Sequence, residues 1–250
     1  MSVCPSGEQF ELRRGSQRVV VTEVGAGLRE WEGVLDGYAA DAMASSGRGQ
    51  VLLPWPNRLR DGRYEWEGEE LQLPVNELPA HGPPSAIHGL VRWIAWTAVE
   101  RTESRVALEH VLHPLPGYPF ALRLRVEYTL AGDGLIVRTA AENVGARAAP
   151  FGAGHHPYVA RHADDVFGPG VQRDDPEPFA GELRIADVTV WGDEHWRWAQ
   201  LYTGDDRPDV ARRAIAVEPM TCRAEAFATG DDVIRLEPGD VFDARWGIAP

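Results

Sequence analysis

Short runs of alternating hydrophobic and polar residues dominate the chain and predict β-strands. In the clearest run, residues 121–130, Leu122, Leu124, Val126 and Tyr128 alternate with charged or polar residues, which is the period of a half-buried strand. Similar runs, bounded by turn-forming residues, occupy residues 18–23, 104–111, 134–140, 186–191, 198–202, 213–217 and 233–236. No long segment has a helical period. The pattern therefore predicts an all-β protein, either an antiparallel sandwich or a barrel.

One segment departs from this pattern. Residues 161–187 are acidic, rich in glycine and proline, and weakly patterned, a composition typical of surface loops. We therefore expect mostly loop there. No linker divides the rest of the chain, and 250 residues suit one large β domain, so we predict a single domain over residues 1–250.

Charge and residue types exclude several classes of function. Acidic residues exceed Lys plus Arg by 38 to 25, a formal net charge of −13, whereas nucleic acids and anionic membranes are bound by basic surfaces. All 25 of those basic residues are arginine, which excludes Schiff-base chemistry on lysine. The composition does not exclude the binding of neutral ligands.

Cysteine usage and hydropathy are typical of a cytoplasmic protein. Cys4 and Cys222 lie far apart in the sequence and form neither a metal motif nor a redox motif. No apolar run approaches the ~18–20 residues of a membrane span, and the polar start lacks a signal-peptide core. We therefore expect a cytoplasmic location and neither a membrane nor a nucleic-acid partner.

Two segments place polar side chains beside turns. In residues 54–61 (PWPNRLRD), the prolines favour a rigid loop that presents Asn57 and Arg58. These could donate to ligand oxygens, or Asn57 could cap a turn while Arg58 pairs on the surface. In AIHGLVRW, His88 precedes a glycine; it could serve a polar site or end a strand.

Two further segments contain candidates for acid–base chemistry. In GAGHHPYV, His155 and His156 point to opposite sides if the chain is extended, so one could face a site and the other the outside. His156 is a candidate general acid. In AVEPMT, Glu218 ends an apolar run, where burial would raise its pKa toward that of a base; a salt-bridged role is the alternative. The spacing fits no metal motif, so we predict no metal.

Together, PWPNRLRDG, IHGL, HHPY and VEPMT resemble the aldose 1-epimerase (galactose mutarotase) family, in order and spacing, from Gly47 to the C-terminus. The chain looks most similar to the shorter bacterial members. The resemblance implies a large antiparallel β-sandwich, a hexopyranose substrate, and interconversion of its α and β anomers by ring opening and closure. It implies no cofactor.

The resemblance also implies roles for individual residues. Glu218 matches the catalytic base of the family and His156 its catalytic acid. The residues implied to bind substrate are His88, Arg58, Asn57 and Tyr158.

The chain departs from the family after Tyr158. Only residues 159–187 separate it from the next matching strand, a shorter interval than the family's, and the family's sugar-binding aspartate motif is missing. None of the available aspartates matches that motif: Asp164, Asp165, Asp174 and Asp175.

Two alternatives therefore stand beside the epimerase. One is a hexose-6-phosphate 1-epimerase with Arg60 and Arg92 at the phosphate, and the other is a non-catalytic carbohydrate-binding protein. The sequence predicts neither the physiological sugar nor the oligomeric state.

Overall fold

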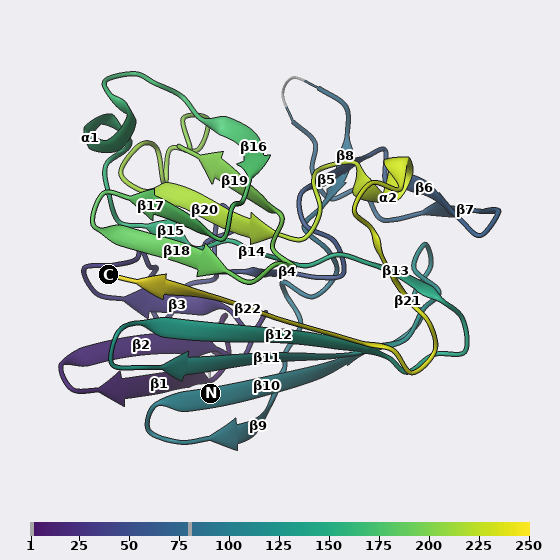
Figure 1. The fold of residues 1–250 in the computed structure, drawn as a ribbon, viewed down its shortest axis with the longest axis horizontal. Coiled ribbons are helices and arrows are strands. Elements are labelled where there is room, and N and C mark those ends of the chain that lie inside the picture. The colour runs from purple at the N-terminus through teal and green to yellow at the C-terminus, as the bar shows by residue number, and fades with distance from the viewer. Residues whose placement is uncertain (1–2, 80–81) are drawn as a thin grey trace.

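Nearly all of the regular secondary structure is antiparallel β-sheet (Figure 1) in the computed structural model, which describes residues 3–79 and 82–250. The largest sheet consists of β9 (Thr97–Arg101), β10 (Arg105–Leu112), β11 (Leu122–Leu130), β12 (Leu135–Asn143), β17 (Glu182–Ile185), β18 (Val188–Gly192) and β22 (Val241–Ala249). Its strand order is β17–β18–β22–β12–β11–β10–β9. The alternation at 121–130 is confirmed, because β11 buries every second side chain.

In Figure 1, a six-stranded sheet lies above β12, β11, β10 and β9 of this sheet and at the height of β17 and β18. It consists of β4 (Val51–Leu52), β14 (Gly154–His155), β15 (Tyr158–Val159), β16 (Asp174–Pro178), β19 (Trp198–Tyr202) and β20 (Ile215–Met220). The order is β16–β19–β20–β14–β4, and β15 also pairs with β20. Every residue of β20 is buried, so this strand lies inside the molecule.

Smaller elements complete the fold. A three-stranded sheet contains β1 (Gln9–Arg14), β2 (Gln17–Thr22) and β3 (Leu28–Trp31). The three strand pairs are β5 (Arg58–Arg60) with β8 (Ser85–Ile87), β6 (Arg63–Trp66) with β7 (Glu69–Gln72), and β13 (Ala149–Phe151) with β21 (Ile234–Leu236). The helices are α1 (Ala163–Phe167) and α2 (Ala226–Thr229). Among the described residues, no helix has the length and apolar character needed to cross a membrane.

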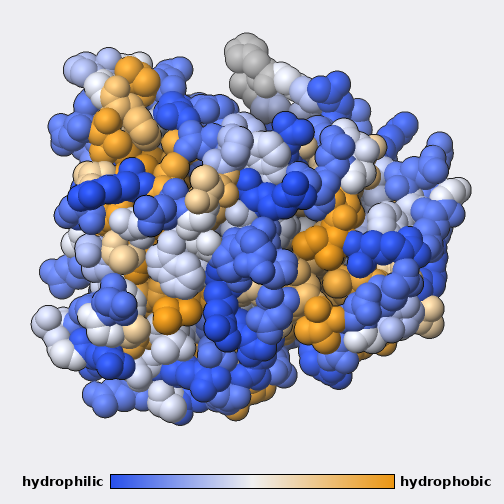
Figure 2. Space-filling view, in the orientation of Figure 1, coloured by the Kyte–Doolittle hydropathy of each residue, from blue (hydrophilic) through white to orange (hydrophobic). Residues whose placement is uncertain are grey.

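The two large sheets pack face to face around one apolar core. Val137 and Trp246 from the seven-stranded sheet and Ala199 and Val217 from the six-stranded sheet belong to the same cluster of buried side chains. Hydrophilic residues predominate on the face shown in Figure 2, where the apolar surface is divided into separate patches. The predicted antiparallel β-sandwich is confirmed.

The loop prediction for residues 161–187 is wrong in part, because α1, β16 and β17 lie within it. The His162 side chain caps the N-terminus of α1 by accepting a hydrogen bond from the Asp164 backbone N–H. β16 is an edge strand, where prolines are tolerated, and most of its residues are exposed. It is therefore held by backbone pairing with β19 and has no hydrophobic alternation to detect.

Candidate active site

A cavity of about 640 Å³ lies where the six-stranded sheet meets the β5–β8 pair, with walls from β5, β8, β16, β19 and β20. Five of the six predicted site residues line it: Asn57, Arg58, His88, His156 and Glu218. These residues are up to about 160 positions apart in the sequence, so only the fold brings them together.

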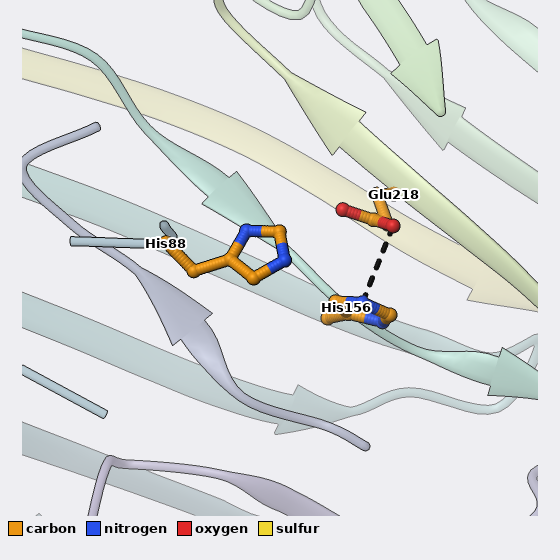
Figure 3. A group of neighbouring side chains, drawn as sticks. All are labelled: His88, His156 and Glu218. Atoms are coloured by element: carbon orange, nitrogen blue, oxygen red, sulfur yellow. Dashed lines mark ion pairs between the residues drawn. The ribbon is translucent and has the colours of Figure 1, made fainter. Parts of the chain in front are cut away.

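Glu218 and His156 form a buried pair on the cavity wall. Glu218 projects from β20, and His156 lies between β14 and β15. The His156 Nε2 and Glu218 Oε1 atoms are 3.2 Å apart (Figure 3). The other carboxylate oxygen, Oε2, is buried without a hydrogen-bond partner among the described residues. One oxygen thus contacts the imidazole, and the hydrogen-bonding capacity of the other is unused.

Burial disfavours the charged form of both members of the pair. It raises the pKa of Glu218 to about 8, with a further contribution from the negative charge of Asp174. It lowers the pKa of His156 to about 3, assisted by the positive charge of Arg92. Between these two values the pair holds one proton in total, and burial favours the neutral arrangement with that proton on the carboxyl.

The His156 ring is held in place from several sides. It stacks on Tyr158 with ring centroids 5.1 Å apart and an angle of 11° between the planes. On another side lies Gly47, where an added Cβ would be 2.5 Å from His156 Cδ2. Glycine at position 47 therefore permits the backbone to contact the imidazole. The edge of His88 faces the same ring at a centroid distance of 5.3 Å.

Tyr158 does not line the cavity, so the structure does not place it where the sequence analysis expected a substrate contact. Its hydroxyl donates to the backbone carbonyl of Ser46 at 2.8 Å. Tyr158 therefore supports His156 from behind.

Asn57 and His88 fix one another by reciprocal hydrogen bonds. The Asn57 backbone N–H donates to His88 Nδ1 at 3.1 Å, and the His88 backbone N–H donates to the Asn57 carbonyl at 3.0 Å. Both residues have positive φ values, 57° and 61°. Burial lowers the pKa of His88 well below its usual value, so the ring is neutral. Because Nδ1 accepts, the proton is on Nε2.

This tautomer bears on metal binding. One ligand atom from each of His88, His156 and Glu218 lies within 4.8 Å of the others. A metal at His88 would need a free lone pair, but Nδ1 already accepts a hydrogen bond and Nε2 carries the proton. The donor set therefore favours hydrogen bonding to a ligand oxygen over metal ligation.

Glu77 positions Arg58 at the cavity wall. Its carboxylate accepts two hydrogen bonds from the Arg58 guanidinium, at 2.6 Å from Nε and 3.0 Å from Nη2. Such a bidentate pair fixes the plane of the guanidinium and leaves Nη1 as a donor. No feature of the sequence around Glu77 indicated this role.

Gln200 and Asp174 are cavity residues that the sequence analysis did not select. Gln200 accepts from Asn57 Nδ2 at 3.2 Å and donates to Asp174 Oδ1 at 2.7 Å. Asp174 thus supplies a carboxylate to the cavity although it matches no family motif. By contrast, Asp164 pairs with Arg212. Adjacent positions on a strand face opposite sides, and Asp175 accordingly pairs with Arg173 outside the cavity.

His155 points into the sandwich, so the expectation that one histidine faces the outside is wrong. The side chain is 2% exposed and contacts Trp246 and Trp196 at centroid distances of 4.9 and 5.6 Å. Its Nε2 is hydrogen-bonded to Thr139 Oγ1 at 2.7 Å. The far side of β14 is covered by the second sheet, which the local sequence does not reveal.

The architecture is that of known aldose epimerase homologues. The structure of a candidate aldose 1-epimerase from Escherichia coli K12 superposes with a TM-score of 0.81, at 18% identity over 97% of this chain and 98% of that one. A GalM/aldose epimerase homologue from C. elegans gives a TM-score of 0.77 at 13% identity, over 97% and 98% of the two chains. At these identities the likeness establishes the fold alone.

Sequence similarity establishes the family. Residues 8–169, more than half of the chain, match the family model described as Aldose 1-epimerase. The uncharacterized protein YihR of Escherichia coli (strain K12) is 33% identical over 94% of this chain and 90% of its own length. The chain belongs to the aldose 1-epimerase family, as the resemblance predicted.

Proposed function

We propose that this protein is an aldose 1-epimerase that interconverts the α and β anomers of a hexopyranose, with Glu218 and His156 as its proton-transfer pair. The main support is the buried contact of 3.2 Å between these two side chains on the wall of a cavity. Membership of the family supports the reaction class and a sugar substrate.

A pair that holds one proton suits this reaction. In ring opening, Glu218 takes the proton of the C1 hydroxyl while His156 donates one to the ring oxygen, the bond between C1 and the ring oxygen breaks, and the free aldehyde forms. The reacting arrangement has the proton on His156, which is the charged arrangement that burial disfavours, and ring opening ends with the proton on Glu218. After rotation about C1–C2, the reverse transfers close the ring on the other face. Both states have the same total charge, so neither adds a net charge to the buried site.

The remaining cavity groups are suited to hold the sugar. The Nε2–H of His88 and the free donor of Arg58 are available to the ring oxygen and its neighbouring hydroxyls, where they would stabilise developing charge. The amide of Gln200, which contacts both Asn57 and Asp174, holds these two groups in position. The Asp174 carboxylate would accept from a sugar hydroxyl.

The charge of the cavity favours a neutral sugar over a phosphorylated one. Its charged side chains are three arginines and four carboxylates: Arg58, Arg92, Arg207, Glu77, Asp174, Asp206 and Glu218. Arg60, one of the two arginines considered for a phosphate, does not line the cavity. With the Glu218–His156 pair holding one proton, the other three carboxylates balance the three arginines, so the cavity has no net positive charge to attract a phosphate.

Polarimetry of freshly dissolved α-D-glucose and α-D-galactose tests the proposal. The protein should accelerate the approach to anomeric equilibrium, and Glu218→Gln should lower kcat by roughly 10²–10⁴-fold, the usual contribution of a general acid or base. His156→Asn should have an effect of similar size. Glu65→Gln, at an exposed carboxylate of β6, is the matched control and should not change the rate.

Other outcomes would identify the alternatives. Faster anomeric equilibration of glucose 6-phosphate, with no effect on the free sugars, would identify the phosphate-specific epimerase. Binding of sugars, seen by calorimetry, with no acceleration of any of them would identify a carbohydrate-binding protein on this fold.

A further inference from the structure

The rim of the cavity contains an exposed aromatic ring that the proposed reaction does not use. Trp93 lines the cavity and is 55% exposed, whereas Trp96, three residues later, is 2% exposed. An exposed large apolar side chain at the rim of a cavity is typical of a surface that contacts a bound ligand. Leu78, 80% exposed, lines the same cavity.

Arg92 connects this ring to the reacting groups. Its guanidinium carbon lies 4.1 Å from the centroid of the Trp93 ring. The same charge contributes to the low pKa values of His88 and His156, so the guanidinium is within electrostatic reach of the pair. Arg92 therefore contacts Trp93 and also acts electrostatically on His156, and all three residues line the same cavity.

Arg92 itself is held firmly. It donates to the Gln50 side chain and to the Ile87 carbonyl, both at 3.1 Å, and its Nε is buried without a hydrogen-bond partner among the described residues. One face of the Trp93 ring is thus covered by a fixed guanidinium. The other face and the edge of the Trp93 ring are then the parts that remain open to a ligand.

The cavity is also larger than one sugar ring requires. Its volume of about 640 Å³ lies well within the ~300–1,000 Å³ of pockets that hold drug-sized ligands, and a single hexopyranose is smaller than such a ligand. Space therefore remains beside a sugar that contacts Glu218 and His156.

We propose that Trp93 forms a second sugar subsite, so that the preferred substrates are reducing disaccharides or longer oligosaccharides whose second ring stacks on the indole. The proposal rests on the proposed epimerase function. The reaction requires a free C1 hydroxyl on the first ring, so the second ring must be attached at another carbon. The C–H face of a pyranose is apolar, and a fixed tryptophan is a suitable surface for it.

Maltose, isomaltose and glucose test this, because all three present the same reducing glucose ring. In the wild-type protein at least one disaccharide should have a higher kcat/KM than glucose. Trp93→Ala should lower the ratio of disaccharide kcat/KM to glucose kcat/KM about tenfold. Trp93→Phe should keep most of the wild-type ratio. Trp66→Ala is the matched control, because Trp66 also lies beneath an arginine but outside the cavity; it should leave the ratio unchanged.

An unchanged ratio of disaccharide to glucose kcat/KM in Trp93→Ala would overturn the proposal. The proposal would also be overturned if the wild-type protein accelerated the anomerisation of glucose but not that of maltose or isomaltose. If no sugar were turned over, the epimerase function would fail, and saturation-transfer NMR would test the subsite separately. Transfer to the second ring of maltose or isomaltose that disappears in Trp93→Ala would support the subsite, and its absence in the wild-type protein would overturn it.

Discussion

His155 should make the protein sensitive to acid without taking part in the reaction. Burial lowers the pKa of this side chain from 6.5 to about 3. Because the folded-state pKa lies below the unfolded-state value, the unfolded chain binds the proton first. The stability associated with a neutral His155 is therefore complete above pH 6.5 and is lost as the pH falls toward 3.

The magnitude follows from the same values. The difference of 3.5 pH units, 6.5 minus 3, at about 1.4 kcal/mol per unit corresponds to about 5 kcal/mol at its full extent. At pH 5 the unfolded histidine is 1.5 units below its pKa of 6.5 while the folded one is still neutral. The loss between pH 8 and pH 5 is then about 2 kcal/mol.

Urea unfolding of the wild-type protein and of His155→Gln at pH 8 and pH 5 measures this loss. Glutamine does not titrate, and its amide can replace Nε2 as a partner of Thr139. The wild-type free energy of unfolding should fall by about 2 kcal/mol more than that of the variant, because the other buried groups titrate in both proteins and cancel. His113→Gln, at an exposed position, is the control. Equal losses in the wild-type protein and His155→Gln would refute the reasoning.

Two further predictions concern the reaction. The pair of Glu218 and His156 should work only while it holds one proton, so kcat/KM should follow a bell-shaped pH profile that declines above about pH 8; a profile still flat at pH 10, after subtraction of the uncatalysed rate, would contradict this. Asp174→Asn should raise KM about tenfold, with a smaller effect on kcat, because a charge-assisted hydrogen bond to the sugar is lost; its neighbour Asp175→Asn is the control, and equal kinetics in the two variants would exclude Asp174 from sugar binding.

Strands that alternate in the sequence were predictable, and edge strands were not. β11 lies where the alternation places it, because one face of the strand is packed on the core. β19 occupies the predicted residues 198–202, although its three central residues are buried in succession and do not alternate. β16 was missed, since an exposed edge strand needs only a backbone partner, and that partner, β19, comes about twenty residues later. Asp174 was missed for the same reason, because its place in the cavity depends on the pairing of β16 with β19.

The sequence by itself determined the all-β class, the family and the identity of the candidate catalytic residues. Alternation and short motifs involve residues that are close together in the chain, so they can be read without the fold. The tertiary structure alone decided which atoms meet. It placed His155 between the sheets, Tyr158 behind His156 and Glu77 against Arg58, and it buried Glu218 so that its pKa rises to about 8. Burial and charge–charge contacts depend on residues distant in the sequence, so these properties arise only when the sheets are assembled.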